Sequence, residues 1–352
     1  MKILAASKSC AIALCLAYLS MSTPALHAEA PLTPALVLRD DATRDQDDLC
    51  IWLHPERPAE STVVVSDKAA SKIFVYDLTG KAIDAIAVDG KPGNIDLRYG
   101  FPLGAQRVDI AAYNDRDNKQ IRVYQIDPES RKLLRVDDGA IATELNYGMT
   151  LYRSPKTGKF YAFTVPDSDG DRAGQYELYS NGSGKIAGRL VRSWKQGKSE
   201  GCVADDDHAR LFIAEETRGI WRFEAEPDAS TEGELILPIG EHGFTADAEG
   251  LTIFHRSDGT GFLIASSQGN SQFKIFRRET PHAYVDTFTV EGAKETDGID
   301  LLNANLGPEF PQGVFALHNG AITPCPTLVC RLDGIAALTG AGLWNPRDLP
   351  GE

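Results

Sequence analysis

The sequence contains little positive charge. Its 36 lysine and arginine residues are outnumbered by 50 aspartate and glutamate residues, which gives a formal net charge of -14. Nucleic-acid-binding proteins need a basic face to neutralise phosphates, and no basic stripe is present. The composition argues against nucleic acid as a partner. It leaves two interpretations, a soluble acidic protein or a protein that holds cations.

Long hydrophobic runs are absent after the first thirty residues. Residues 1–30 contain two lysines, the apolar run CAIALCLAYLSM, which is too short for a membrane span, and the small residues ALHAEA. This pattern predicts a signal peptide that is cleaved after Ala28 or Ala30. We therefore expect a secreted or periplasmic protein with no membrane anchor.

Cysteine is scarce in the mature chain. Removing the signal peptide leaves Cys50, Cys202, Cys325 and Cys330, none of which has the spacing of zinc ligands. Cys50 and Cys202 lie in apolar strand patterns that are typical of buried thiols. Cys325 and Cys330 are close enough in sequence to pair, and export would permit a disulfide.

Helical periodicity is nearly absent as well. The chain alternates short β-branched or aromatic runs, such as KIFVYDL and KFYAFTV, with turn sequences such as DLTGK and SNGSGK. These patterns predict an all-β protein that is rich in hairpins.

The strand pattern repeats six times with a period of about fifty residues. A polar position opens the first strand of each repeat, at Asp48, Asp96, Tyr147, Glu200, Glu249 and Asp300. A second position follows the next strand, at Lys68, Arg116, Ser168, Glu216, Gln268 and His318. Six units of about four strands each predict a six-bladed β-propeller. We expect one propeller domain over residues 31–340, a tail at 341–352, and a monomer.

Equivalent positions of all blades meet at one end of a propeller's channel, so the two series should share one rim. The side chains there are rich in oxygen. The candidate metal ligands are Asp47, Asp48, Asn94, Asp96, Tyr147, Glu200, Glu215, Glu216, Asp247, Glu249, Gln268, Asn270, Asp297 and Asp300. Oxygen ligands in this number select Ca²⁺, and a cation would relieve the repulsion between carboxylates. The alternative is an ordinary polar surface.

Two smaller acidic segments have different interpretations. The loop DSDGDRAG at residues 167–174 resembles part of a calcium-binding loop but lacks its closing glutamate. The acids at 205–207 fall at the opposite end of their strands, where we expect an ordinary solvated turn.

The predicted rim also carries two cations. Lys68 and Arg116 hold matched places in adjacent repeats. Arg98 lies nearby in sequence and is a third candidate substrate-binding cation. Metal ions together with Lys and Arg suit a phosphate-bearing polyanion, whereas a single surface cation is more simply explained by a salt bridge. No cysteine or histidine phosphatase motif is present. His208 and His318 are candidate proton donors, although His208 is better explained as a surface residue.

Six motifs resemble, in order, those of the β-propeller phytases, which are calcium-dependent phytate hydrolases. They extend from about residue 40 to residue 320 and read DDLCIWLHP, GNIDLRYGFPL, EGCVADDDHARLFIAEE, DAEGLTIF, LIASSQGNSQFKIF and TDGIDLLNANLGPEFPQGVF. The resemblance implies a 3-phytase that holds several Ca²⁺ ions, structural and catalytic. It also implies that a metal-bound water hydrolyses phosphomonoesters of myo-inositol hexakisphosphate.

The resemblance assigns roles to individual residues. The implied ligands of the catalytic calcium cluster are Asp47, Tyr147, Glu200, Glu216, Asp247, Glu249 and Gln268, and the implied structural ligands are Asp48, Asn94, Asp96 and Asp297. Lys68 and Arg116 are implied phosphate ligands. The family's loop after AFTV supplies a further lysine, but this chain has PDSDGDRAG. Either Arg172 replaces that lysine or the contact is lost.

Two other functions are compatible with the residues. A six-bladed calcium propeller of the lactonase type would hydrolyse cyclic esters and would need fewer rim cations. A non-catalytic, phytase-like propeller would bind a ligand or a partner without turnover.

Overall fold

The computed structural model describes residues 30–144 and 146–348. The predicted signal peptide, except Ala30, therefore lies outside the described residues. Within the described part of the chain, no helix is both long and apolar enough to cross a membrane.

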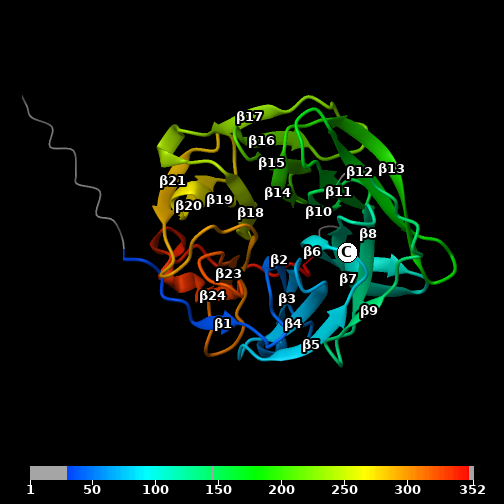
Figure 1. The fold of residues 1–352 in the computed structure, drawn as a ribbon, viewed down its shortest axis with the longest axis horizontal. Coiled ribbons are helices and arrows are strands. Elements are labelled where there is room, and N and C mark those ends of the chain that lie inside the picture. Colours follow the sequence, from blue (N-terminus) through cyan, green and yellow to red (C-terminus); the bar gives the residue numbers. More distant parts are fainter. Residues whose placement is uncertain (1–29, 145, 349–352) are drawn as a thin grey trace, which may run out of the picture. The chain divides into compact units, whose positions relative to one another are not determined.

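Residues 31–348 form six antiparallel four-stranded sheets around a central axis (Figure 1). Blade 1 contains β2 (Gln46–Trp52), β3 (Thr62–Asp67), β4 (Lys72–Asp77) and β5 (Ala82–Ala87). Blade 2 contains β6 (Pro92–Leu103), β7 (Gln106–Asp115), β8 (Gln120–Ile126) and β9 (Leu133–Arg135). Blade 3 contains β10 (Gly148–Arg153), β11 (Phe160–Val165), β12 (Arg172–Ser180) and β13 (Ile186–Lys195). Blade 4 contains β14 (Ser199–Asp205), β15 (Arg210–Glu215), β16 (Gly219–Glu224) and β17 (Glu234–Pro238). Blade 5 contains β18 (Ala248–His255), β19 (Gly261–Ser267), β20 (Gln272–Arg277) and β21 (Tyr284–Phe288). Blade 6 contains β22 (Ile299–Leu302), β23 (Val314–His318), β24 (Thr327–Arg331) and β1 (Leu36–Leu38). The predicted six-bladed propeller is confirmed.

Short 3-10 helices occur in the connections between strands. They are η1 (Pro58–Glu60), η2 (Glu241–Gly243), η3 (Gln268–Asn270), η4 (Leu332–Gly334) and η5 (Ala336–Leu338).

The ring is closed by a strand from the other end of the chain. β1 pairs antiparallel with β24, so that Leu36 lies opposite Val329 and Leu38 opposite Thr327. The sequence repeat did not reveal this closure, because a three-residue apolar segment carries no period of its own.

The hydrophobic core lies between neighbouring blades. One cluster joins blades 1, 2 and 6, and four others join blades 2 and 3, 3 and 4, 4 and 5, and 5 and 6. The inner strands are buried on both faces and therefore read as continuous apolar runs, as in TVVVSD of β3. The outermost strands, such as β5, are only partly buried.

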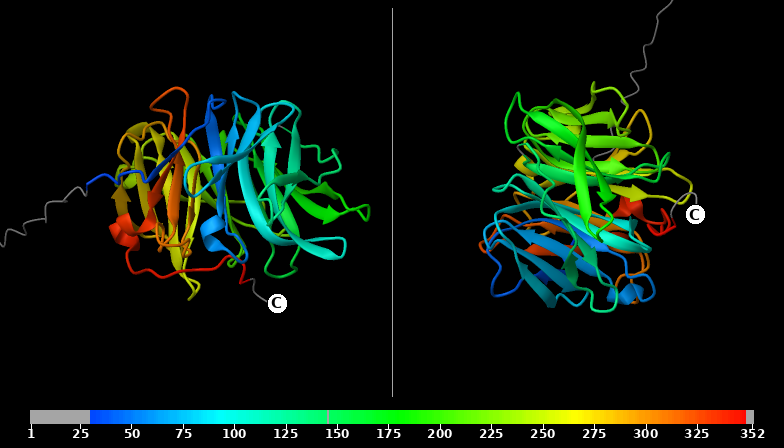
Figure 2. Two further views of the ribbon diagram at one scale, coloured as in Figure 1. Left: turned by 90° about the horizontal axis from the view of Figure 1, so that it is seen from below. Right: turned by 90° about the vertical axis from the view of Figure 1, so that its right-hand side faces the viewer.

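The C-terminal segment crosses the end of the propeller opposite to the starts of the inner strands (Figure 2). Trp344 stacks on His255 of β18 with ring centroids 4.1 Å apart. Arg347 donates to the backbone oxygen of Leu53 at 3.0 Å and pairs with Asp109 of β7. This segment thus ties several blades together.

All four described cysteines are free thiols. The disulfide between Cys325 and Cys330 that the sequence permits is not formed in this structure. Cys330 is buried within β24, whereas the backbone N–H of Cys325 donates to the oxygen of Arg44 on the N-terminal segment. The two residues belong to different surroundings despite their proximity in sequence.

Candidate active site

The first strand of each blade begins where the second strand ends. Gln46 pairs with Asp67 in blade 1, and Ser199 pairs with Glu215 in blade 4. The other four blades have the same arrangement. The two predicted series of repeated positions therefore meet at one end of the channel, which we call the channel mouth.

Three buried glutamates converge at the channel mouth. Glu200 and Glu249 lie near the starts of β14 and β18, and Glu216 directly follows β15. Each offers a carboxylate oxygen within 4.8 Å of those of the other two. Glu216 Oε1 and Glu249 Oε2 are buried and have no hydrogen-bond partner among the described residues. Buried oxygens that need a partner fit a hard divalent cation such as Ca²⁺.

Burial raises the pKa of all three glutamates. It raises the pKa of Glu200 to about 7, although Arg116 opposes the shift. It also raises the pKa of Glu249 well above its usual value, and repulsion by Glu200 adds to the effect. The pKa of Glu216 is raised by burial against the opposing effect of Lys198. A bound cation would remove much of the cost of ionising the three groups together.

Glycines bring the inner strands close enough for the glutamates to meet. A Cβ atom on Gly148 would lie 1.8 Å from the backbone oxygen of Glu200, and one on Gly201 would lie 2.1 Å from that of Glu249. Similar approaches to the next blade occur at Gly250 and Gly298. Each of these glycines directly follows a predicted ligand, so the residue pairs Tyr-Gly, Glu-Gly and Asp-Gly combine a ligand with the close packing that it needs.

Two cations lie beside the glutamates. Lys68 Nζ is 2.7 Å from Asp47 Oδ1 and 3.2 Å from Asp297 Oδ2. Arg116 donates to Asp47 Oδ2 at 2.9 Å and also pairs with Glu200. Burial would raise the pKa of Asp47, but Arg116 and Lys68 together hold it below its usual value. The structure thus brings Lys68 and Arg116, two of the predicted phosphate ligands, to the predicted metal ligands.

Tyr147 links these cations to a residue that the sequence analysis missed. The Arg116 guanidinium carbon lies 4.4 Å from the centre of the Tyr147 ring, and Lys198 Nζ lies 5.3 Å from it. Lys198 Nζ is also 2.9 Å from Glu216 Oε2. Burial and the neighbouring Glu200 raise the pKa of Tyr147, so its hydroxyl stays protonated. The position of Lys198 two residues before Glu200 was the signal available in the sequence.

Blades 5 and 6 complete the channel mouth. Gln268 donates to Asp297 Oδ1 at 2.7 Å, and burial raises the pKa of Asp297 to about 6. The charge of Asp247 raises the pKa of Glu216, which indicates that Asp247 lies near the glutamates. His318 Nδ1 accepts the backbone N–H of Asp297 at 3.1 Å, and burial lowers the pKa of His318 to about 4. His318 is therefore neutral near pH 7 and a poor proton donor.

A second group of predicted ligands lines the channel itself. Asp48, Asn94, Asp96 and Asp300 surround a cavity of about 40 Å³. Asn94 Oδ1 is buried without a partner in the described part of the chain. Burial raises the pKa of Asp48 well above its usual value and that of Asp300 to about 7. These oxygens also fit a hard cation.

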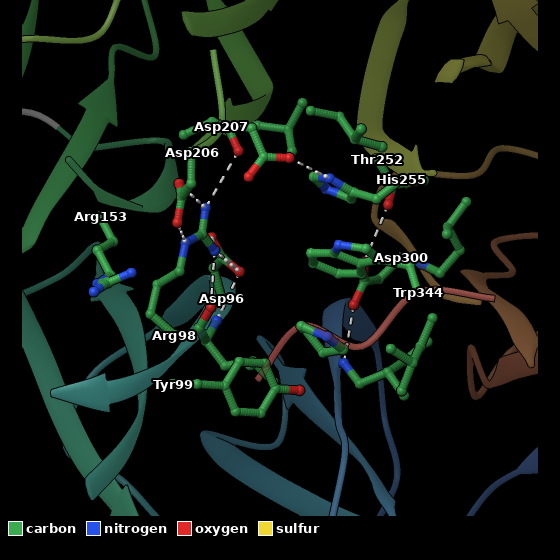
Figure 3. A pocket seen from close by; sticks show the side chains of 18 of the residues that line it. Asp96, Arg98, Tyr99, Arg153, Asp206, Asp207, Thr252, His255, Asp300 and Trp344 are labelled. Atoms are coloured by element: carbon green, nitrogen blue, oxygen red, sulfur yellow. Dashed lines mark hydrogen bonds and ion pairs between the residues drawn. The ribbon is translucent and has the colours of Figure 1, made fainter. Parts of the chain in front are cut away.

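Arg98 lies away from the channel mouth. It lines a cavity of about 160 Å³ at the opposite end of the channel (Figure 3). Its side chain is 2.8 Å from Asp206 and 3.0 Å from Asp96, and it donates to the backbone oxygen of Leu151 at 2.6 Å. The structure does not bring Arg98 to Lys68 and Arg116, the other predicted phosphate ligands.

The acids at 205–207 do not form a solvated turn, so that expectation is wrong. Arg278 is fully buried, pairs with Asp205, and lies 2.7 Å from Asp207. Asp206 pairs with Arg98. All three acids are thus neutralised by arginines from other blades, which a reading of the hairpin alone could not show.

Three further predicted site residues have partners outside the group of three glutamates. Arg172 donates to the side chain and the backbone oxygen of Ser193, both at 2.8 Å. Glu215 accepts a hydrogen bond from Gln196 at 3.2 Å. Asn270 is exposed, and its amide donates to a backbone oxygen of the preceding loop at 2.8 Å. Their roles stay predictions.

Comparisons with known proteins agree with this arrangement. The chain matches the model of the Phytase family over residues 2–324. A 3-phytase of Bacillus subtilis (strain 168) is 41% identical over 295 residues, which cover 80% of this chain and 75% of that protein.

Solved structures with low sequence identity share the fold alone. A luciferin-regenerating enzyme has a TM-score of 0.52 and 12% identity, covering 84% of this chain and 95% of that chain. A regucalcin from Agrobacterium tumefaciens, a calcium-binding protein, has a TM-score of 0.50 and 10% identity, covering 86% of this chain and 97% of that chain. The family assignment rests instead on the family model and the Bacillus relative. Because that model spans nearly the whole chain, the chain belongs to the Phytase family.

Proposed function

We propose that this protein is a calcium-dependent phytase that releases phosphate from myo-inositol hexakisphosphate with water as the nucleophile. The observation that carries the proposal is the convergence of Glu200, Glu216 and Glu249 beside Arg116 at the channel mouth. A phosphate monoester carries two negative charges, and a metal-binding group together with cationic donors can neutralise them during hydrolysis.

The metal site would be built from the residues at the channel mouth. Glu200, Glu216 and Glu249 would hold Ca²⁺, since their oxygens lie close together and two of them have no partner among the described residues. Calcium bound there would neutralise phosphate charge and lower the pKa of bound water. The protein's own residues hold and orient the substrate.

The cations would bind the phosphate undergoing hydrolysis. Lys68 and Arg116 converge on Asp47, so their donors already face one region of the channel mouth. There they can donate to phosphate oxygens and stabilise the charge that spreads over them in the transition state. The protonated hydroxyl of Tyr147 is a further donor beside Arg116.

The direct test is phosphate release from phytate as a function of calcium concentration. We expect turnover in calcium, its loss after full metal depletion, and its recovery when calcium returns. Full activity after depletion would overturn the metal-dependent mechanism. Turnover of a lactone without turnover of phytate would favour the lactonase alternative, and binding without any turnover would favour the non-catalytic one.

Export is a separate part of the proposal. The apolar run and small residues of positions 1–30 support a secreted or periplasmic protein. N-terminal sequencing of the exported protein should give a start at residue 29 or 31. A start at residue 1 would contradict export by signal-peptide cleavage.

A further inference from the structure

The C-terminal strap, which we define as residues 341–348, crosses the end of the channel opposite to the channel mouth (Figure 2). On one side, the N–H of Trp344 donates to the oxygen of Asn303 at 2.9 Å, directly after β22 of blade 6. On the other side, the guanidinium carbon of Arg347 lies 4.5 Å from the centre of the Tyr99 ring in β6 of blade 2. Blades 6 and 2 are not neighbours in the ring, so the strap bridges the channel end.

The larger channel cavity lies under this strap. Trp344 and Pro346 form part of the wall of the cavity of about 160 Å³ (Figure 3). The same cavity shares Asp96 and Asp300 with the cavity of about 40 Å³ around Asn94. The two cavities are therefore neighbours along the channel, and the strap forms the wall of the one nearer to the channel end.

The smaller cavity carries the oxygens that fit a hard cation. Asn94 is 5% exposed, and its Oδ1 has no hydrogen-bond partner within residues 30–144 and 146–348. A cation that left this place through the channel mouth would pass the positive charges of Lys68 and Arg116. The wall of the larger cavity contains five aspartates and two arginines, so the route toward the strap carries net negative charge. Electrostatics thus favours the strap end as the way in and out.

We propose that the C-terminal strap is a gate for the channel cation. Its displacement opens the larger cavity to solvent and lets the ion enter and leave at the end opposite to the channel mouth. The inference goes beyond the proposed function, because it concerns exchange of the ion near Asn94 and not phosphate release. Gly342, Leu343 and Asn345 of the strap are exposed, and a segment of this kind opens locally at a lower cost than a blade unfolds. The match to the Phytase family ends at residue 324, so the strap lies outside it.

The first test measures release of radioactive calcium from the calcium-loaded protein into excess chelator. Asn94→Ala identifies the channel ion, because this variant should lose one slow component of the release. Trp344→Ala removes the stack on His255 and should speed that component about two- to tenfold, since release follows the population of open straps. Leu343→Ala, at an exposed strap residue, is the matched control and should release calcium at the wild-type rate.

A second measurement reports opening without calcium. Cys202 is buried and lines the smaller cavity, so its labelling by a small thiol reagent follows access to the channel. Trp344→Ala should speed this labelling by a similar factor. Cys330 is buried in β24, the third strand of blade 6, and reports unfolding of the blade instead. Its labelling should keep the wild-type rate.

Other outcomes would overturn the gate. Unchanged calcium release and unchanged Cys202 labelling in Trp344→Ala would leave the strap as a tie between blades. Faster labelling of Cys202 and Cys330 together would mean general unfolding and not gating. If Asn94→Ala lost no component of the release, no ion would be bound at Asn94 and the proposal would fail. Failure of the wild type to hydrolyse phytate would contradict the proposed function and would leave these results unaffected.

Discussion

Without calcium, the stability of the propeller should fall as the pH rises, and Glu200 allows the size of the effect to be worked out. Burial raises the pKa of Glu200 from 4.5 to about 7 in the folded protein. The folded state therefore keeps this proton at a pH at which the unfolded chain has lost it. The associated stability is complete below about pH 4.5 and is lost as the pH rises through about 7. The loss is about 3 kcal/mol, since each tenfold change in an equilibrium constant corresponds to about 1.4 kcal/mol.

Urea unfolding of metal-depleted protein between about pH 4 and about pH 8 would measure this loss. The change Glu200→Gln removes the titrating group but keeps the side chain's shape, so the variant should lose about 3 kcal/mol less than the wild type over this range. Glu232→Gln, at an exposed glutamate, is the matched control and should behave as the wild type. Saturating calcium should flatten the wild-type dependence. Equal losses in Glu200→Gln and wild type would refute the reasoning.

Three further changes test how the site is supported. Arg278→Met should lower the free energy of unfolding in urea by about 3–5 kcal/mol, because it leaves the buried Asp205 without its arginine partner. An unchanged unfolding midpoint would contradict the role given to this pair. Gly201→Ala should lower the melting temperature and the calcium affinity together, because the new Cβ would collide with the backbone of Glu249. Wild-type values for both would show that the close approach of the β14 and β18 backbones is not needed. Arg347→Ala should cost about 1–3 kcal/mol in the same urea assay, since it removes hydrogen bonds to blades 1 and 2; no loss would mean that the C-terminal segment does not tie the blades.

The repeat made the propeller and its channel mouth predictable. Two series of positions at a period of about fifty residues marked the starts of the inner strands and the loops after the second strands, and both lie where the period placed them. Antiparallel register then brings the two series to the same end. A period in sequence is enough here because each blade repeats the same backbone path.

Side-chain contacts between different blades were not predictable in the same way. The pairing of Asp205 with Arg278 joins residues of blades 4 and 5, and Arg98 pairs with Asp206 across the channel. No local pattern encodes such partners. The same limit explains why the acids at 205–207 read as a solvated turn.

Lys198 shows a third limit of prediction from sequence: the direction in which a side chain points. Its place in the sequence, two residues before Glu200, was visible, but a lysine before a strand is usually a solvated surface residue. The contacts of its ammonium group with Glu216 and the Tyr147 ring show that it is directed toward the channel mouth.

The most direct test of the central claim is a crystal structure of the active enzyme grown in calcium, with anomalous scattering used to locate the ions. We predict a calcium ion bound by Glu200, Glu216 and Glu249, the three glutamates that converge at the channel mouth. An enzyme that hydrolyses phytate in the same solution but has no cation between these glutamates would contradict the account.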